Sequence, residues 1–468
     1  MATQNQNILD DHRIGHLLLK LSLPSFVGMF VMTLYNIVDT IFVGHYVGTL
    51  GIAGLSIVFP FQMMCMGVGQ LIGLGGASLI SRLIGADNIP RAERALGNAL
   101  ATVLVLSALI MIVAFSNIDF WLSLMGASDT ILPYARDYMS IIIIGMFFQT
   151  LAMSSNGLIR SEGNAKVPMI AMMIGGGMNI VFDAIFIIAL DMGIQGAALA
   201  TVTAQFMSAS YVMRYYLSGR SFLKIHVRNM LFELSILKEI FAIGIASFAR
   251  TFATSLSVVM VNNILVVYGG DLAVSAYGII HRIIMFVLMP GITIGQGLQP
   301  VLGFNYGAKR FDRAMRAIKL ALIAATGICI TLFAVIQITP EPIISIFTTD
   351  SELIDLASHG ARRVFAALYL TGFIMVSSLI FQAIGKARQS FLTAIAKPIL
   401  FFIPLLFTLP HFFHLDGVWM VFPIADGLTF LVTLSLIIPE LRELKKRDVF
   451  EKKQEWKTAQ SDFPVGSF

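Results

Sequence analysis

Twelve apolar runs of about 20 residues recur along the chain, and they constrain its fold more than any other feature. A run of this length is long enough to span the hydrocarbon core of a bilayer. Only helices satisfy their own backbone hydrogen bonds in such a segment, so we predict an all-α membrane protein with twelve transmembrane helices. The runs are centred near Met29, Met63, Val105, Gly145, Gly177, Gln205, Leu256, Met285, Ala325, Gly372, Ile399 and Leu428.

The composition supports a membrane protein and argues against the other classes. Of the 468 residues, 57% are hydrophobic and only 13% are charged, so a soluble protein could not cover its apolar surface with polar groups. A strand barrel would need short alternating segments, and a cleavable signal would need a shorter first apolar run. Cys65 and Cys329 lie in apolar runs without metal-ligand spacing, which predicts buried, inert thiols.

Positive charge is distributed unevenly about the predicted membrane. Most of the 32 Lys and Arg fall on one side, together with both ends of the chain. This asymmetry predicts a multi-pass protein of the inner membrane with both termini in the cytoplasm. The net charge of +5 therefore reports topology, and no nucleic acid partner is expected. The exceptions are Arg136, Arg362 and Arg363 on the other side, and Arg250, Arg282 and Lys397 within spans.

The second half of the chain repeats the first at a constant offset of 222 residues, which carries Gly69, Gly73, Gly85 and Gly163 to Gly291, Gly295, Gly307 and Gly385. Two halves of six spans each have parallel topology, an arrangement common in transporters. The predicted organisation is a cytoplasmic N-terminus (1–13), a six-helix lobe (14–218), a cytoplasmic linker (219–235), a second six-helix lobe (236–440) and a cytoplasmic tail (441–468). We expect the later part of the linker to form an amphipathic surface helix and the tail to be solvated, or to touch anionic lipid.

Two carboxylates interrupt the apolar runs of the first half. Asp39 lies in FVGMFVMTLYNIVDTIFVG and Asp183 in VPMIAMMIGGGMNIVFDAIFIIAL. An ionisable group is costly in hydrocarbon and is by default an ion or proton site. At the repeat offset the two acids correspond to Val261 and Leu405, so a cation site would belong to the first lobe alone.

Polar side chains on the same and nearby spans accompany these acids: Tyr35, Asn36, Thr40, Asn156, Asn179, Thr201 and Thr203. Positions three or four apart share a helix face, which places Tyr35 beside Asp39 and Asn179 beside Asp183. Their oxygens suit a small alkali cation, or a proton shared between two acids. The alternative is that a basic residue from the second half neutralises each acid and only fixes the packing.

Other residues are expected to serve the substrate and the movement of the lobes. Proline within a span permits a bend, so Pro24 is a candidate hinge, with a static kink as the alternative. Asp426 either pairs with Lys397 or takes part in transport. Methionine packs adaptably and suits promiscuous surfaces. The candidate lining of a substrate cavity is Met29, Met32, Met63, Met64, Met153 and Phe286.

Three segments resemble the multidrug and toxic compound extrusion (MATE) family, in its DinF/MepA-like branch. They are LSLPSFVGMFVMTLYNIVDTIFVGHYVG, GGASLISRLIGADNIPRAERAL and MNIVFDAIFII, and the resemblance extends over residues 14–440. It implies a V-shaped pair of pseudo-symmetric lobes with a cation site in the first. No cation site is expected in the second lobe, because the spans that carry acids in another branch contain none here.

The resemblance also implies roles for individual residues. It implies that Asp39, Asn179, Asp183 and Thr201 bind Na⁺ or H⁺, with Tyr35 one turn before the first acid. Asn156 matches the family pattern on the fourth span, and Pro24 matches the proline at which the first helix bends.

We therefore expect an antiporter that exports amphipathic, often cationic, organic compounds in exchange for H⁺ or Na⁺ by alternating access. Its expected partners are small-molecule drugs or metabolites and the lipid bilayer, with no cofactor beyond the coupling ion and with a monomer as the simplest state. The alternative is a flippase, or an exporter of a lipid-linked or endogenous metabolite. An enzyme is not expected, because HExxH and GxSxG motifs are absent and His281 is isolated.

Overall fold

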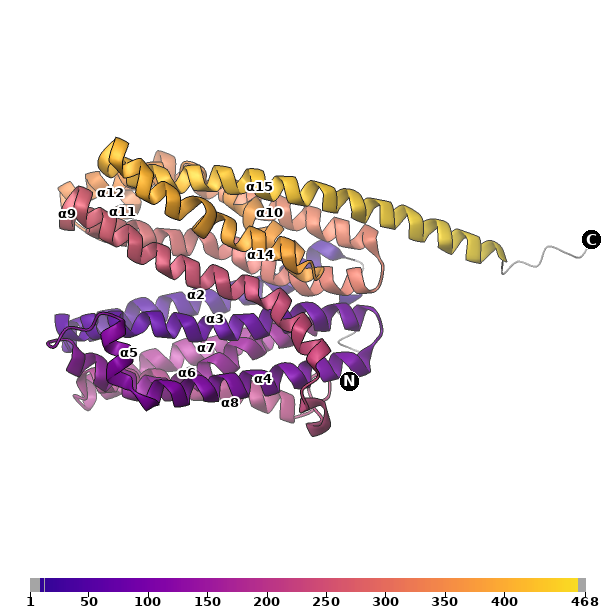
Figure 1. Cartoon of the computed structure of the whole chain (residues 1–468), viewed down its shortest axis with the longest axis horizontal. Coiled ribbons are helices and arrows are strands. Elements are labelled where there is room, and N and C mark those ends of the chain that lie inside the picture. The colour runs from indigo at the N-terminus through magenta and orange to yellow at the C-terminus, as the bar shows by residue number, and fades with distance from the viewer. Residues whose placement is uncertain (1–8, 12, 462–468) are drawn as a thin grey trace, which may run out of the picture.

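The computed structural model describes residues 9–11 and 13–461, and this described part is helical without any strand. The predicted N-terminal segment (1–13) and tail (441–468) thus lie partly outside the described residues. Figure 1 shows the helices as two layers, one from each half of the chain. Both ends of the chain leave the bundle at the same end, which we call the terminal face (Figure 1).

The first lobe contains six spans and one short helix outside them. Asn88 and Asn117 cap two of its helices, since each side chain accepts a hydrogen bond from a backbone N–H three residues on. The elements are α2 (Ile14–Tyr46), α3 (Thr49–Gly85), α4 (Ile89–Ser116), α5 (Ile118–Leu124), α6 (Leu132–Ser161), α7 (Lys166–Asp183), the π-helix η1 (Ala184–Ala189) and α8 (Gly193–Leu217).

The second lobe follows a short 3₁₀ helix, η2 (Val227–Met230), in the linker. Its elements are α9 (Leu234–Gly307), α10 (Phe311–Ile338), α11 (Pro340–Ile344), α12 (Ser351–Val364), α13 (Leu368–Ala383), α14 (Ala387–Ile395), the π-helix η3 (Ala396–Phe402) and α15 (Ile403–Ser461). Non-helical backbone at Gly270 divides α9 into two spans, and non-helical backbone at His414 does the same for α15.

These breaks account for the number of spans. Eight helices in the described part are long and apolar enough to cross a membrane, and two of them are the divided α9 and α14–α15. The bent pair α12 and α13, which meet at 53°, adds one span. The less apolar α8 completes the twelve, so the predicted all-α fold with two six-helix lobes is confirmed.

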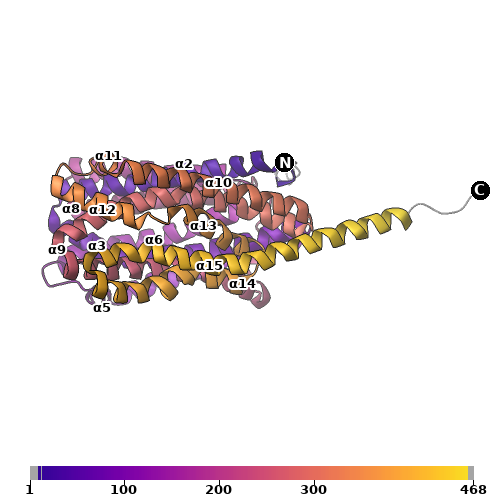
Figure 2. The ribbon, with the colours of Figure 1, turned by 90° about the horizontal axis from the view of Figure 1, so that it is seen from above.

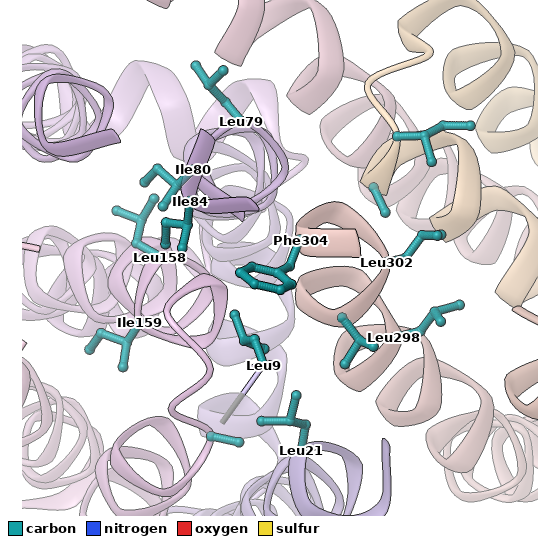
Figure 3. Close-up of a cluster of buried hydrophobic side chains, with 14 of the residues drawn as sticks. Leu9, Leu21, Leu79, Ile80, Ile84, Leu158, Ile159, Leu298, Leu302 and Phe304 are labelled. Carbon is teal, nitrogen blue, oxygen red and sulfur yellow. The ribbon is translucent and has the colours of Figure 1, made fainter. Parts of the chain in front are cut away.

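Three hydrophobic cores explain how the lobes are joined. One core lies in the half of the bundle nearest the terminal face and contains residues of both lobes. Figure 3 shows Phe304 of the second lobe close to Leu9 and Ile84 of the first. The other two cores each belong to a single lobe and lie in the opposite half. The lobes are therefore fused near the terminal face and packed separately beyond it.

Two glycines related by the 222-residue offset make very close contacts between the lobes. A Cβ at Gly85 would overlap the carbonyl oxygen of Phe304, and a Cβ at Gly307 would overlap the carbonyl oxygen of Arg82. The two carbonyl residues are themselves related by the same offset. The ends of α3 and α9 thus meet in a reciprocal, pseudo-two-fold contact that only glycine permits.

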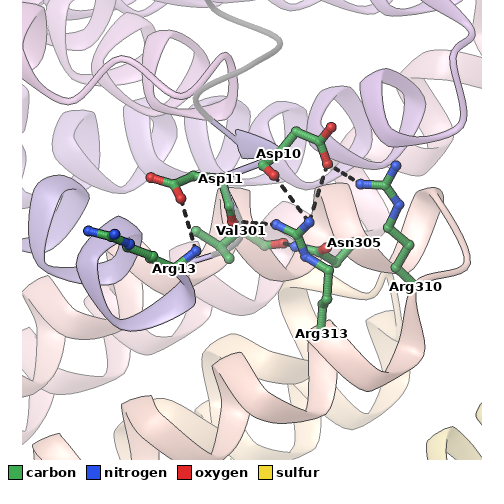
Figure 4. Close-up of polar contacts among 7 residues, drawn as sticks. All are labelled: Asp10, Asp11, Arg13, Val301, Asn305, Arg310 and Arg313. Atoms are coloured by element: carbon green, nitrogen blue, oxygen red, sulfur yellow. Dashed lines mark hydrogen bonds and ion pairs between the residues drawn. The ribbon is translucent and has the colours of Figure 1, made fainter.

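The described N-terminal residues cross from one lobe to the other. Leu9 is buried in the shared core and packs against Gly163 of the first lobe. Asp10 forms ion pairs with Arg310 and Arg313 of the second lobe (Figure 4). The Arg313 guanidinium also donates to the backbone oxygens of Asp10 and Asp11, at 3.1 and 2.5 Å. We call residues 9–11 the N-terminal strap.

The linker is held on the first lobe. The Glu162 carboxylate accepts hydrogen bonds from the Ser221 hydroxyl and the Phe222 N–H, at 2.8 and 3.1 Å. The Asn98 amide donates to the carbonyl oxygens of Asn229 and Leu231, both at 3.1 Å. The prediction of an amphipathic surface helix in the later part of the linker is therefore wrong. These side chains satisfy an irregular backbone, which forms only a single 3₁₀ turn before α9 begins.

The last helix continues far beyond the bundle. Figure 2 shows α15 leaving the terminal face as an extended helix. Its charged residues form pairs one turn apart, Arg447 with Glu443 and Lys452 with Asp448, which support an exposed helix.

Candidate functional site

Close packing between α2 and α7 brings the two acids of the first lobe to the same region. A Cβ at Gly28 of α2 would meet Met172 of α7, at 2.9 Å from its sulfur. A Cβ at Gly176 of α7 would lie 3.1 Å from the ring of Tyr35 on α2. Glycine on both helices therefore lets their backbones approach, as small residues do in membrane bundles.

The structure joins Asn179 and Thr201 directly. The Asn179 amide of α7 donates a hydrogen bond to the Thr201 hydroxyl of α8 at 3.2 Å, and both side chains are buried. Asp183 lies one turn beyond Asn179 and is fully buried. The carboxyl groups of Asp39 and Asp183 lie within electrostatic range of each other and of the Tyr35 phenol. Four residues predicted for the site, with Tyr35, thus form one cluster.

The acceptors of this cluster lack hydrogen-bond donors. Oδ1 of Asp39, Oδ1 of Asn179 and both carboxylate oxygens of Asp183 are buried without a hydrogen-bond partner among the described residues. Buried polar atoms are normally paired, because an unpaired one loses its water without compensation. Four unpaired oxygens in one place are the ligand set that a proton or a small hard cation needs.

A π-helix begins directly after Asp183. The segment η1 covers Ala184–Ala189 and separates this acid from the end of the span. Short π-helical segments are rare and are often found at functional sites, since the extra residue rotates the neighbouring side chains and frees backbone groups. Sequence reasoning did not foresee it, because no local residue pattern specifies i to i+5 pairing.

Two further residues belong to the surroundings of the acids and were missed. Tyr138 of α6 lies near enough to Asp39, Tyr35 and Asp183 for an electrostatic interaction. Its hydroxyl accepts a hydrogen bond from the Gln62 amide of α3 at 3.3 Å. Both are polar residues inside spans, which is the signal that could have identified them.

Asn156 and Pro24 lie outside this cluster. Asn156 is buried five residues before the end of α6, whereas Asp183 is the last residue of α7, which starts from the same face. At 1.5 Å per residue the two differ in depth by roughly 18 Å. Pro24 lies inside α2, which continues unbroken from Ile14 to Tyr46.

The six residues predicted to line a substrate cavity are all partly buried. Met64 packs against the separate core of the first lobe. A Cβ at Gly69 would lie 3.1 Å from Cβ of Met153, so this methionine packs against α3. Phe286 of α9 forms an edge contact with Phe30 of α2, with 6.3 Å between ring centres. The substrate cavity remains a prediction.

The polar residues of the second lobe have a different arrangement. Lys397, within η3, forms an ion pair with the buried Asp426 at 2.6 Å. The pairing alternative for Asp426 is thus the one present in the structure. Arg250 is partly buried on α9, and Arg282 of the same helix is exposed. No group of three His, Cys, Asp or Glu in the described residues could hold a metal ion.

Comparisons with known proteins agree on one family. The MatE family model matches residues 24–185 and 243–408. Multidrug export protein MepA of Staphylococcus haemolyticus (strain JCSC1435) is 26% identical over 428 residues, which cover 92% of this chain and 94% of that protein. MepA of Staphylococcus aureus (strain NCTC 8325 / PS 47) is also 26% identical, over 430 residues, with the same coverage of both chains.

Solved structures are similar over nearly the whole chain. The MATE multidrug transporter DinF-BH has a TM-score of 0.85 and 39% identity, and the match covers 92% of this chain and 97% of that one. An outward-facing conformation of a multidrug resistance MATE family transporter has a TM-score of 0.89 and 27% identity. That match covers 94% of this chain and 98% of the transporter.

Proposed function

Because the chain belongs to the MatE family and is a multidrug efflux transporter, we propose that it is an antiporter that exchanges an organic compound for H⁺ or Na⁺. The observation that carries this proposal is the set of four buried oxygens on Asp39, Asn179 and Asp183 that have no hydrogen-bond partner in the described part of the chain. The coupling cation occupies these oxygens together with the Thr201 hydroxyl. It is a transported substrate, and no other cofactor is required.

The exported compounds are amphipathic and often cationic. The names of the relatives, multidrug export protein MepA and the MATE multidrug transporter DinF-BH, support the export of more than one drug. A cationic compound and the coupling cation compete for the same carboxylates, which links the binding of one to the release of the other. Each ligand shifts the conformational equilibrium only by its difference in affinity for the two states.

The way the lobes are joined supports alternating access. The shared core closes the terminal face, and the cores beyond it are separate. With both termini in the cytoplasm, as the positive charge around the terminal face favours, this conformation is closed toward the cytoplasm. Separation of the shared core, with closure of the opposite half, gives the alternate state.

The test is efflux of ethidium from cells or inverted vesicles with a pH gradient or a Na⁺ gradient imposed separately. Asp39→Asn and Asp183→Asn remove a charged acceptor while keeping side-chain size, so each is expected to abolish gradient-driven export. Asp191→Asn, in the exposed turn before α8, is the matched control and should export normally. Normal export by either site variant would overturn the proposal, and the gradient that drives wild-type export identifies the ion.

A further inference from the structure

A cavity of about 820 Å³ lies at the terminal face, between the lobes and away from the acid cluster. The end of α3 and the start of α4 supply its first-lobe wall, with Leu83 and Arg91. Both ends of α9, the start of α10 and the projecting part of α15 supply the second-lobe wall, with Phe311 and Lys446. A volume of this size accommodates a small molecule or a lipid headgroup.

The basic residues around this cavity outnumber the acidic ones. Five basic and three acidic residues line it. Each of the three carboxylates already has a basic partner, because Arg82 pairs with Glu239 at 2.8 Å, Lys309 pairs with Glu451 at 3.4 Å, and Arg447 pairs with Glu443.

Two basic residues of the cavity lining remain to be accounted for. Arg91 and Lys446 are exposed, and neither forms an ion pair within the described part of the chain. Arg91 belongs to the first lobe and Lys446 to the second. The cavity thus offers a single anion two positive charges, one from each lobe, that have no ion-pair partner among the described residues.

The rest of the lining is apolar and lies beside the membrane. Leu79, Leu83 and Phe311 line the cavity, and Phe450 is 59% exposed there. The transmembrane helix α3 ends at Gly85, in the same wall. An anionic headgroup with an apolar body matches this surface, since basic pockets between spans on the cytoplasmic side bind acidic lipid headgroups.

We propose that this cavity binds a phosphate-bearing anion, and that an anionic phospholipid of the adjoining leaflet is its natural source. Arg91 and Lys446 contact the phosphate from opposite lobes, and the leucine and phenylalanine side chains contact the acyl chains. The binding is independent of transport. A bound anion also holds the two lobes together at the terminal face, and this second consequence rests on the proposed function.

Binding is measured by native mass spectrometry and by thermal melting of the purified full chain in detergent. The probes are dioleoyl phosphatidylglycerol, dioleoyl phosphatidylcholine and inorganic phosphate. Wild type is expected to bind phosphatidylglycerol saturably and more tightly than phosphatidylcholine. The double variant Arg91→Gln/Lys446→Gln is expected to bind it about thirtyfold more weakly, at about 1 kcal/mol for each basic residue. Binding of inorganic phosphate with the same dependence on Arg91 and Lys446 would support the site and assign it to the free anion.

The matched control is Arg94→Gln/Lys445→Gln, which removes the same charge from the same two helices outside the cavity lining. It should bind like wild type. Equal binding by the two double variants, or no preference of wild type for the anionic lipid, would overturn the proposal. If the Arg91→Gln/Lys446→Gln protein does not fold, the two single substitutions replace it, each with an expected loss of a few-fold. Export of ethidium plays no part in this readout, so a failure here leaves the antiport proposal standing.

Discussion

Thr201 and Thr203 lie two positions apart on α8 and have different partners. The Thr201 hydroxyl accepts a hydrogen bond from the Asn179 amide at 3.2 Å. The Thr203 hydroxyl instead donates a hydrogen bond to the backbone oxygen of Leu199 in its own helix, at 2.8 Å. Only the first hydroxyl therefore belongs to the proposed cation site. The pair separates the effect of a site oxygen from the effect of losing a hydroxyl inside a span.

Thr201→Val is expected to weaken cation binding without abolishing export. It removes one oxygen ligand and leaves the Asn179 amide unpaired, which costs about 1 kcal/mol, or roughly fivefold in affinity. The coupling-ion concentration for half-maximal efflux should rise by that factor. Thr203→Val should leave it unchanged, and an equal rise in both variants would contradict the assignment.

Glu162 provides a pH-dependent contribution to stability outside the membrane. Burial raises its pKa from the ordinary value of 4.5 to about 7, and hydrogen bonds from Ser221 and Phe222 oppose this shift. The unfolded chain therefore loses this proton near pH 4.5, whereas the folded protein keeps it until about pH 7. Since the folded state binds more protons between these values, stability falls as the pH rises through this window and levels off above it.

We expect the melting temperature of wild type in detergent to decrease between pH 5 and pH 7.5, by an amount equivalent to about 2–3 kcal/mol. Glu162→Gln removes this titration and should flatten that part of the curve. Glu93→Gln, which neutralises another carboxylate that accepts a hydrogen bond from the linker, serves as the control and should keep the slope. A slope that persists in Glu162→Gln would assign it to other groups.

At the scale of elements, the ends of α3 and α9 make the reciprocal glycine contact. Gly85→Ala or Gly307→Ala places a methyl group against a carbonyl oxygen of the other lobe, so each is expected to separate the lobes at the terminal face. Spin labels on α4 and α15 should then show a longer distance than in wild type. Gly327→Ala is the control, because a Cβ there meets nothing within 4 Å. An unchanged distance in both interface variants would contradict the packing.

The spans and the repeat could be predicted because the length and apolarity of each run, and the 222-residue offset between the halves, can be read directly from the sequence. Gly163 and Gly385, related by the offset, both have positive φ, 85° and 81°, at the same turn of each lobe. The π-helix η1 and the break at His414 could not be predicted, since tertiary packing selects them. For the same reason, the sequence identified Asn179 and Thr201 as candidates but missed Tyr138, whose role depends on the approach of α6.

At the scale of the whole molecule, the N-terminal strap adds to the shared core. Asp10→Asn removes the ion pairs with Arg310 and Arg313, so we expect the fraction of molecules with a closed terminal face to decrease. Partly exposed ion pairs are worth about 1 kcal/mol, which corresponds to a shift of about threefold to tenfold in the ratio of closed to open molecules. The same spin-label distances measure this ratio.

Asp11→Asn is the control for the strap. Among the described residues, the Asp11 side chain accepts a hydrogen bond only from the nearby Arg13 N–H, and the contact of Asp11 with Arg313 uses the backbone oxygen (Figure 4). It should therefore leave the ratio unchanged. If both substitutions shift the ratio equally, the effect comes from net charge at the terminus and the strap has no specific role.

The attachment of the linker has a consequence for chain continuity. The segment from Ser221 to Glu233 leads into the second lobe by sequence but is bound to the first by Glu162, Glu93 and Asn98. The turn just before it, at Gly219, has a positive φ of 68°, and a Cβ placed there would meet nothing within 4 Å. A polypeptide that began there would carry its own docking peptide for the other half. We therefore expect that two separately translated halves, divided at this turn, would assemble into the same fold.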